Sequence, residues 1–138
     1  MSTLPTTHLA DLIRRKHDVL AQLCDVGHRQ TEIVDRGETA ALLQLLAAKQ
    51  NMITVMQQVE RELAPYHGED PNARVWTSPA ARAHCAEQAA ECNRLLAEIV
   101  ELERHSAERM TVRRNEVAAQ LRQVHVAGQA RHAYEAHK

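Results

Sequence analysis

The feature that most constrains the fold is the run from Ala80 to Ala127, which contains neither glycine nor proline. Because these two residues are the usual helix breakers, the run predicts one very long helix. Ser78 precedes it, and its hydroxyl can accept a hydrogen bond from a free backbone N–H. Pro79 suits the first turn because it has no N–H to leave unpaired. The helix is expected over about residues 79–132, with a length of about 80 Å at about 1.5 Å per residue.

The first of two shorter helices is expected over about residues 7–35. Its apolar residues recur at steps of three and four, so that they share one face. Thr6 or Thr7 can cap its N-terminus, and Asp11 lies near the positive end of the helix dipole. Gly37 is expected to end the helix in the left-handed conformation.

The second helix, over about residues 38–64, has the most regular heptad pattern of the chain. Its seam consists of Leu42, Leu45, Lys49, Met52, Met56, Val59 and Leu63. Lys49 interrupts the apolar residues, and we expect its alkyl stem to pack on the core while its ammonium group reaches solvent. Pro65 is expected to close the helix. The short joint formed by Arg36 and Gly37 predicts that the first two helices make an antiparallel hairpin.

These helices are expected to form one all-α domain spanning residues 1–138. The predicted architecture is an antiparallel helical hairpin packed on one long third helix, a three-helix bundle or coiled coil with a C-terminal extension. The chain has no Phe, so that Leu, Val, Ile, Ala and Met must fill the core. The hairpin, at about 40 Å, can cover only about half of the third helix. In the intervening loop, residues 65–78, Trp76 is expected to plug one end of the bundle.

Composition excludes several classes of function. The net charge of −1 argues against general nucleic-acid binding, which needs a surplus of Lys and Arg to neutralise phosphates. No stretch approaches the roughly 20 apolar residues that span a bilayer. The first residues lack a basic segment followed by an apolar one, so that no signal peptide is expected. We therefore expect a cytoplasmic protein with no nucleic-acid partner and no membrane insertion.

The three cysteines, Cys24, Cys85 and Cys92, are an odd number without a CxxC pair. Cys85 and Cys92 are seven residues apart on one expected helix, about 10 Å along its axis, which is too far for a disulfide. The pattern indicates buried, reduced thiols of a cytoplasmic protein.

The nine histidines show no recognisable metal-binding or catalytic pattern. Carboxylate-bridged di-iron bundles need Glu-x-x-His pairs, and the chain has none. Glu101 and His105 share a helix face without a second copy of the pair. His84 adjoins Cys85, but the spacing to Cys92 is two full turns, wider than zinc sites usually use. There is also no phosphate-binding loop and no nucleophile beside a base. No catalytic residue, cofactor or metal site is expected, and the protein is not expected to be an enzyme.

The last part of the third helix, from about Arg109 onward, is expected to extend beyond the hairpin. Residues 112–138 contain five basic residues against two acidic ones, whereas the rest of the chain has an acidic excess. Val117, Leu121 and Val124 fall on one face of this helix. Isolated helices are marginal in water, so that this face needs either a partner or burial within the protein, by folding back or in a homodimer.

Three stretches suggest a family. A leucine-rich turn followed by lysine runs from Ala41 to Gln50, and Gln30-Thr31-Glu32-Ile33-Val34 precedes a short glycine break. The third helix ends in an Ala-Arg-His-Ala-Tyr stretch that closes at Tyr134. With these stretches the chain resembles bacterial flagellar type III export chaperones of the FlgN type, and the resemblance covers most of the chain.

The resemblance implies a cytoplasmic helical chaperone that binds the terminal helices of hook–filament junction subunits. Such a chaperone prevents premature assembly and delivers the subunits to the flagellar export gate. It implies that the C-terminal part of the third helix contacts the client, which makes Val117, Leu121 and Val124 candidate client-binding residues. Tyr134 is a candidate contact for a partner such as the export gate. The alternative is a non-catalytic coiled-coil scaffold or dimerisation module whose overhang pairs with itself.

Overall fold

The computed structural model describes residues 4–136 and confirms the all-α class. Within these residues there are three α-helices, one short 3₁₀ helix and no strand. The elements are α1 (Thr6–Arg36), α2 (Thr39–His67), η1 (Pro71–Ala73) and α3 (Pro79–Ala136). In residues 4–136, no helix is both long enough and apolar enough to cross a membrane.

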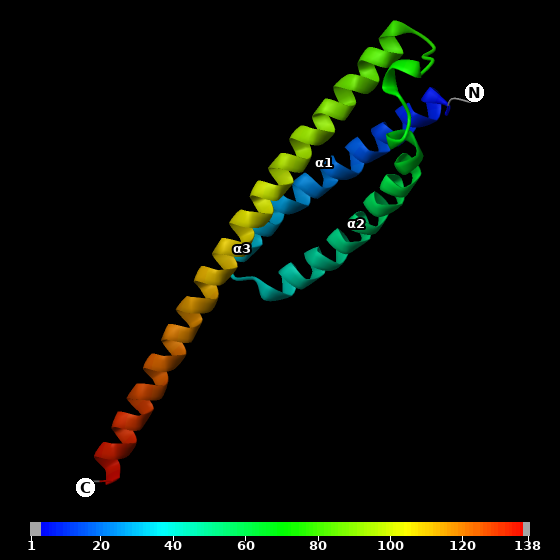
Figure 1. Cartoon of the computed structure of the whole chain (residues 1–138). Coiled ribbons are helices and arrows are strands. Elements are labelled where there is room, and N and C mark those ends of the chain that lie inside the picture. Colours follow the sequence, from blue (N-terminus) through cyan, green and yellow to red (C-terminus); the bar gives the residue numbers. More distant parts are fainter. Residues whose placement is uncertain (1–3, 137–138) are drawn as a thin grey trace.

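Helix α1 is the element on which the other two pack. It forms an antiparallel hairpin with α2 and runs parallel to α3, whose last part continues far past the hairpin (Figure 1). Parallel packing pairs each residue of α1 with one about 70–80 positions later, as in His28 with Glu98 and Asp35 with Arg109. Over residues 4–136 the backbones of α2 and α3 do not approach each other closely. The predicted hairpin on a long helix is therefore correct, and α1 supplies most of the contact with α3.

The core consists of two apolar clusters arranged along α1. The cluster near its N-terminus contains Leu9, Leu12, Val59, Leu63 and Tyr66. The second cluster contains Leu20, Leu23, Cys24, Cys92 and Leu95. The first therefore joins α1 to α2, and the buried members of the second join α1 to α3. All three cysteines are buried and free of disulfides, as predicted.

Two of the predicted helix caps agree with the structure and one differs. Gly37 has φ 69° and ends α1 in the left-handed conformation, as predicted. Ser78 Oγ accepts a hydrogen bond from the backbone N–H of Ala81 at 3.0 Å, which confirms the cap of α3. The prediction that Thr6 or Thr7 caps α1 was wrong. Pro5 occupies that position, and the buried Thr6 hydroxyl instead donates to the carbonyl of Val75 at 2.7 Å.

The ends of α2 and α3 lie beyond the predicted limits. Pro65 does not close α2, which continues to His67. A proline in the last turn removes one backbone hydrogen bond, and this loss is offset because Tyr66 is buried and its hydroxyl donates to the Pro5 carbonyl at 2.9 Å. Helix α3 extends to Ala136 rather than to about residue 132.

The loop after α2 closes one end of the bundle. Trp76 packs against the first apolar cluster, which confirms the predicted plug. Glu69 accepts a hydrogen bond from the backbone N–H of Leu4 at 2.8 Å and from Arg74 Nε at 3.1 Å. Arg74 also donates to the Tyr66 carbonyl at 2.9 Å. The loop is thereby tied to both the N-terminal segment and the end of α2.

Candidate protein-binding surface on α3

The face of α3 that packs on α1 continues beyond the end of α1. Within the bundle this face buries Cys85, Cys92, Leu95 and Ser106. At the same helical spacing it continues through Met110, Val117, Leu121 and Val124, which we call the stripe. The exposed fraction of the stripe residues rises along the helix, from 40% and 52% for the first two to 64% and 70% for the last two. Among residues 4–136, no segment covers the distal stripe.

A groove lies where the stripe leaves the bundle. It has a volume of about 370 Å³ and lies between the joint of α1 and α2 and the adjoining part of α3. The groove is lined by Ile33, Val34, Gly37, Glu38, Thr39, Leu42, Met110, Arg113, Arg114 and Val117. We call it the junction groove. Because Met110 and Val117 belong to both surfaces, the groove and the stripe form one continuous apolar path with two arginines beside it.

Two arginines of α3 hold the C-terminal end of α1. Arg109 Nε donates to Asp35 Oδ1 at 2.8 Å, and the Arg113 guanidinium donates to the backbone carbonyl of Asp35. Positive groups are favoured here because the C-terminal end of a helix carries partial negative charge. These contacts tie α3 to the end of α1 just where α3 leaves the bundle.

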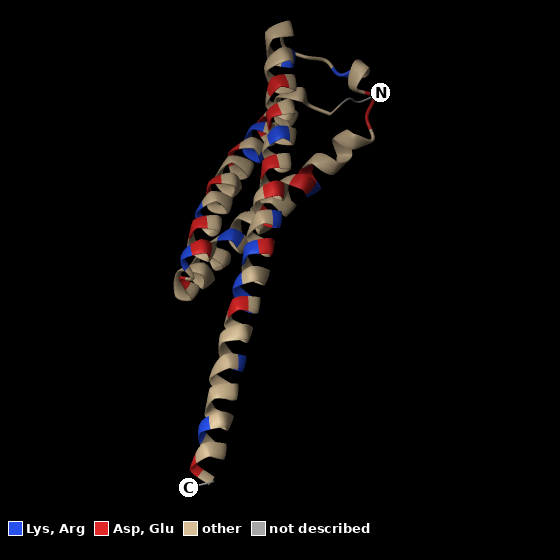
Figure 2. Cartoon of the chain, turned by 90° about the vertical axis from the view of Figure 1, so that its left-hand side faces the viewer, with Lys and Arg blue, Asp and Glu red and all other residues tan. Residues whose placement is uncertain are grey.

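The remainder of α3 is exposed on all sides. Every residue from 120 to 136 is exposed, and we call residues 114–136 the overhang. Figure 2 shows charges of both signs along the bundle and fewer charged residues along the overhang. The charged residues of the overhang are Arg114, Glu116, Arg122, Arg131 and Glu135. The overhang is thus a weakly basic helix with a long apolar face.

The structure brings together three of the four residues singled out from the sequence. Val117, Leu121 and Val124 lie on one face, as their spacing predicts. Tyr134 is 70% exposed, but at about 100° per residue it lies about a third of a turn away from the stripe. Val126 is also exposed and lies on nearly the opposite side of the helix.

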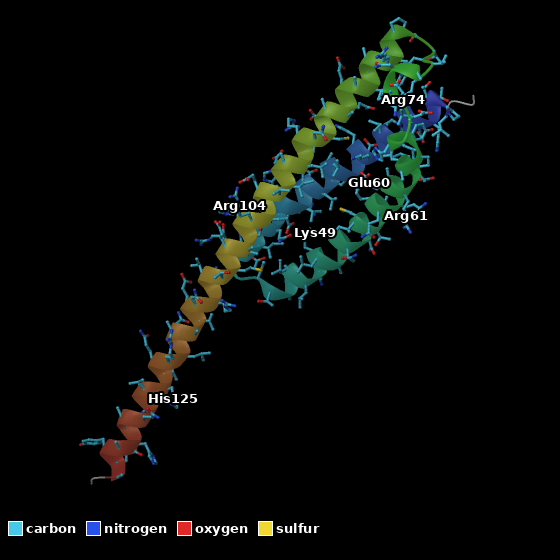
Figure 3. The ribbon with its side chains drawn as sticks, viewed as in Figure 1. Lys49, Glu60, Arg61, Arg74, Arg104 and His125 are labelled. Carbon is cyan, nitrogen blue, oxygen red and sulfur yellow. The ribbon has the colours of Figure 1, made fainter. Side chains whose placement is uncertain are left out.

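Lys49 corrects one sequence expectation. Its side chain is only 13% exposed, and its ammonium group donates to Gln30 Oε1 at 3.0 Å and pairs with Glu103. Figure 3 shows Lys49 on the inner side of α2. Burial lowers the pKa of Lys49. The prediction that the ammonium group reaches solvent was wrong because its partners on α1 and α3 lie within its reach in the bundle.

A set of potential metal ligands lies at the contact between α1 and α3. Cys24, His28 and Glu98 place one sulfur, nitrogen or oxygen atom each within 4.8 Å of one another. His28 Nε2 lies 2.9 Å from Glu98 Oε1. Burial, followed by the hydrogen bond with Glu98, raises the pKa of Cys24 to about 11. The sequence did not predict this set. Cys24 and His28 are one helical turn apart on α1, but Glu98 comes beside them only because of the way α3 packs on α1.

Comparison of the chain with protein-family models, curated proteins and solved structures found no match. The function is therefore inferred from the surfaces of the molecule itself. Two of these offer specific chemistry: the apolar path formed by the junction groove and the stripe, and the cluster of Cys24, His28 and Glu98.

Proposed function

We propose that the protein is a non-catalytic chaperone that holds an amphipathic helix of a partner protein along the junction groove and the stripe. One observation carries this proposal. The face that α3 uses to pack on α1 continues past the end of α1, where the groove begins and no described segment covers the apolar residues. An amphipathic helix is the element that fits such a surface, because it would extend the packing that α1 begins.

The free energy available from the stripe indicates which surfaces a partner helix must contact. Burying a valine, leucine or methionine side chain contributes about 1.5–3 kcal/mol, so that the four stripe residues supply about 6–12 kcal/mol at most. Association itself costs about 4–15 kcal/mol. A helix on the stripe alone would therefore bind weakly, and stable binding requires that it also fill the junction groove against Ile33 and Leu42.

The charges favour a partner helix with acidic flanks. Arg113 and Arg114 line the junction groove, and Arg122 and Arg131 follow along the overhang. Rim charges of this kind mainly steer the encounter and select the partner. Such a partner would be attracted to the overhang and repelled by the acidic excess of the remaining chain.

The resemblance to FlgN-type proteins gives the proposal its specific form. The partner is then a terminal helix of a hook–filament junction subunit, held in the cytoplasm until it reaches the flagellar type III export apparatus. Tyr134, outside the stripe, would remain accessible to a second partner such as the export gate while the client is bound. The runner-up, a coiled-coil scaffold, would place a second copy of this chain on the same stripe.

One experiment distinguishes the chaperone from the coiled-coil scaffold. The purified full-length protein is mixed with a hook–filament junction subunit, and the mass of the species is measured by size-exclusion chromatography with light scattering. The paired substitution V117E/L121E places two negative charges on the stripe, and V126E places one negative charge on the opposite side as a control. Circular dichroism checks that each variant keeps its helices.

The chaperone proposal predicts a complex with the subunit that V117E/L121E abolishes and V126E retains. It also predicts that the protein is monomeric without a client. A stable homodimer that V117E/L121E dissociates, together with no binding of the subunit, would overturn the proposal in favour of the scaffold.

A further inference from the structure

Cys24 and His28 lie one turn apart on α1 and face Glu98 on α3. Their ligand atoms all fall within 4.8 Å of one another. Two ligands separated by one helical turn can bind the same ion, because residues four apart share a face. The third ligand comes from a different helix, so that an ion bound here would connect α1 to α3. This cluster is separate from the stripe and the junction groove.

We propose that Cys24 Sγ, His28 Nε2 and a carboxylate oxygen of Glu98 bind one Zn²⁺ ion. Thiolate and imidazole are preferred ligands of zinc, and a carboxylate is a common third one. Magnesium and calcium prefer oxygen ligands alone and are disfavoured by the sulfur. Three protein ligands leave a fourth tetrahedral position, which a water molecule can fill from the solvent side.

Zinc binding requires side-chain shifts of up to about 1 Å, because the ligand atoms lie within 4.8 Å of one another. Ligand atoms of a tetrahedral zinc site are about 3.3–3.8 Å apart, given metal–ligand bonds of about 2.0–2.3 Å. His28 Nε2 and Glu98 Oε1, now 2.9 Å apart, must separate by about 0.5 Å. Both side chains are partly exposed and can adjust, whereas Cys24 is buried at the base of the site. On binding, the Cys24 thiol releases its proton to solvent and becomes the thiolate ligand.

The surroundings of Glu98 are compatible with this role. Arg94 Nη1 lies 3.5 Å from Glu98 Oε2, the oxygen that does not contact His28. Arg94 also pairs with Glu91, so that its charge is already partly compensated. The arginine can thus orient the carboxylate while Oε1 points toward His28 and the proposed ion. Residues that hold a ligand in this way are typical of zinc sites.

The test is titration of the full-length, metal-free protein with Co²⁺, which adopts zinc geometry and absorbs visibly. A cobalt–thiolate charge-transfer band should appear and saturate at one ion per chain, and Zn²⁺ should displace it. C24S should abolish the band, and H28Q or E98Q should weaken Co²⁺ binding by about tenfold or more. The matched controls are C85S, which removes another buried thiol, and H125Q, which removes an exposed histidine of the overhang. Both should bind Co²⁺ like the parent protein.

Two results would overturn the proposal. The first is the absence of a thiolate band at Co²⁺ concentrations up to the millimolar range. The second is a band that persists in C24S or is weakened as much by H125Q as by H28Q, which would place the ion elsewhere. If C24S fails to fold, H28Q and E98Q still decide the question, since both positions are partly exposed. Thermal unfolding gives a second readout, because Zn²⁺ should raise the Tm of the parent protein but not that of H28Q.

Discussion

Arg109 Nε donates a hydrogen bond to Asp35 Oδ1 at 2.8 Å, and this contact joins α3 to the last turn of α1 just before the overhang begins. Arg113 adds a second contact, to the Asp35 carbonyl. Exposed ion pairs contribute only about 0–1 kcal/mol to stability. We therefore infer that these arginines position the junction groove more than they stabilise the bundle.

For that reason we expect R109A/R113A to change the free energy of unfolding by about 1 kcal/mol or less. Amide hydrogen exchange of residues 107–117 should nevertheless become faster, because the α1 end no longer holds this part of α3. Mass spectrometry of peptides from deuterated protein measures the effect. R122A, on the exposed overhang, is the control and should leave this exchange unchanged. Equal exchange in R109A/R113A and the parent protein would argue against the positioning role.

Lys49 should be more important for stability than a surface lysine. In K49A, Gln30 Oε1 loses the ammonium donor, and leaving a buried acceptor without a partner costs about 1–3 kcal/mol. In Q30L/K49L both partners are replaced by apolar side chains, so that most of this loss should be recovered. Urea denaturation measures both variants. Arg104, an exposed residue of α3, supplies the control R104A, which should stay within about 0.5 kcal/mol of the parent protein. A double variant no more stable than K49A would contradict the explanation.

The left-handed conformation of Gly37 disfavours any residue with a side chain at this position. Its φ of 69° costs an ordinary L-residue about 1–2 kcal/mol, so that G37A should lower stability by about that amount. G37N should cost less, because asparagine tolerates this conformation better. Gly68 has φ −86° and is the matched control, for which we expect G68A to be neutral or slightly stabilising. Thermal unfolding measures the change in stability of the three variants. Equal losses of stability in G37A and G68A would exclude the explanation by backbone conformation.

The success at Gly37 and the failures elsewhere have a common physical reason. Sequence patterns report local preferences, which is why the Ser78 cap, the Gly37 cap and the long α3 were predicted correctly. Pro65 was misjudged because the contact that offsets its missing hydrogen bond comes from Tyr66 and the distant Pro5. Contacts between segments far apart in the chain are not encoded in local periodicity.

The same distinction applies to the candidate sites. The spacing of Val117, Leu121 and Val124 placed them on one face, and the structure shows that face exposed. Their role in binding stays a prediction. The junction groove and the cluster of Cys24, His28 and Glu98 could not be predicted, because each depends on the register between α1 and α3. That register is set by packing, for example by the close approach of Leu102 to Gly27.

Because of Glu69, the free energy of unfolding should fall as the pH becomes acidic. The hydrogen bond from the Leu4 N–H, followed by that from Arg74, lowers the pKa of Glu69 in the folded protein. A lowered folded-state pKa means that the contribution is complete above the unfolded-state pKa, about 4.3, and is lost as pH falls through the folded value. We therefore expect the parent protein to lose stability below about pH 5 more steeply than E69Q. Urea midpoints measured between pH 3 and pH 7 test this. D70N, which changes the neighbouring acidic residue of the same loop, is the control and should keep the steeper slope of the parent protein.

Two leucines of the same chain test whether the stripe is free or covered. Leu20 is 1% exposed in the core, whereas Leu121 is 64% exposed on the overhang. L20A should lower the free energy of unfolding by about 2–5 kcal/mol, since it removes buried contacts and leaves a cavity. L121A should change it by about 0.5 kcal/mol or less, because no contact within the described chain is lost.

The comparison is made by urea denaturation at two protein concentrations, low and high micromolar. If a second copy covered the stripe, L121A would also be destabilising and stability would rise with protein concentration. A midpoint independent of concentration, with only L20A destabilised, is the result expected of a surface kept open for a different partner.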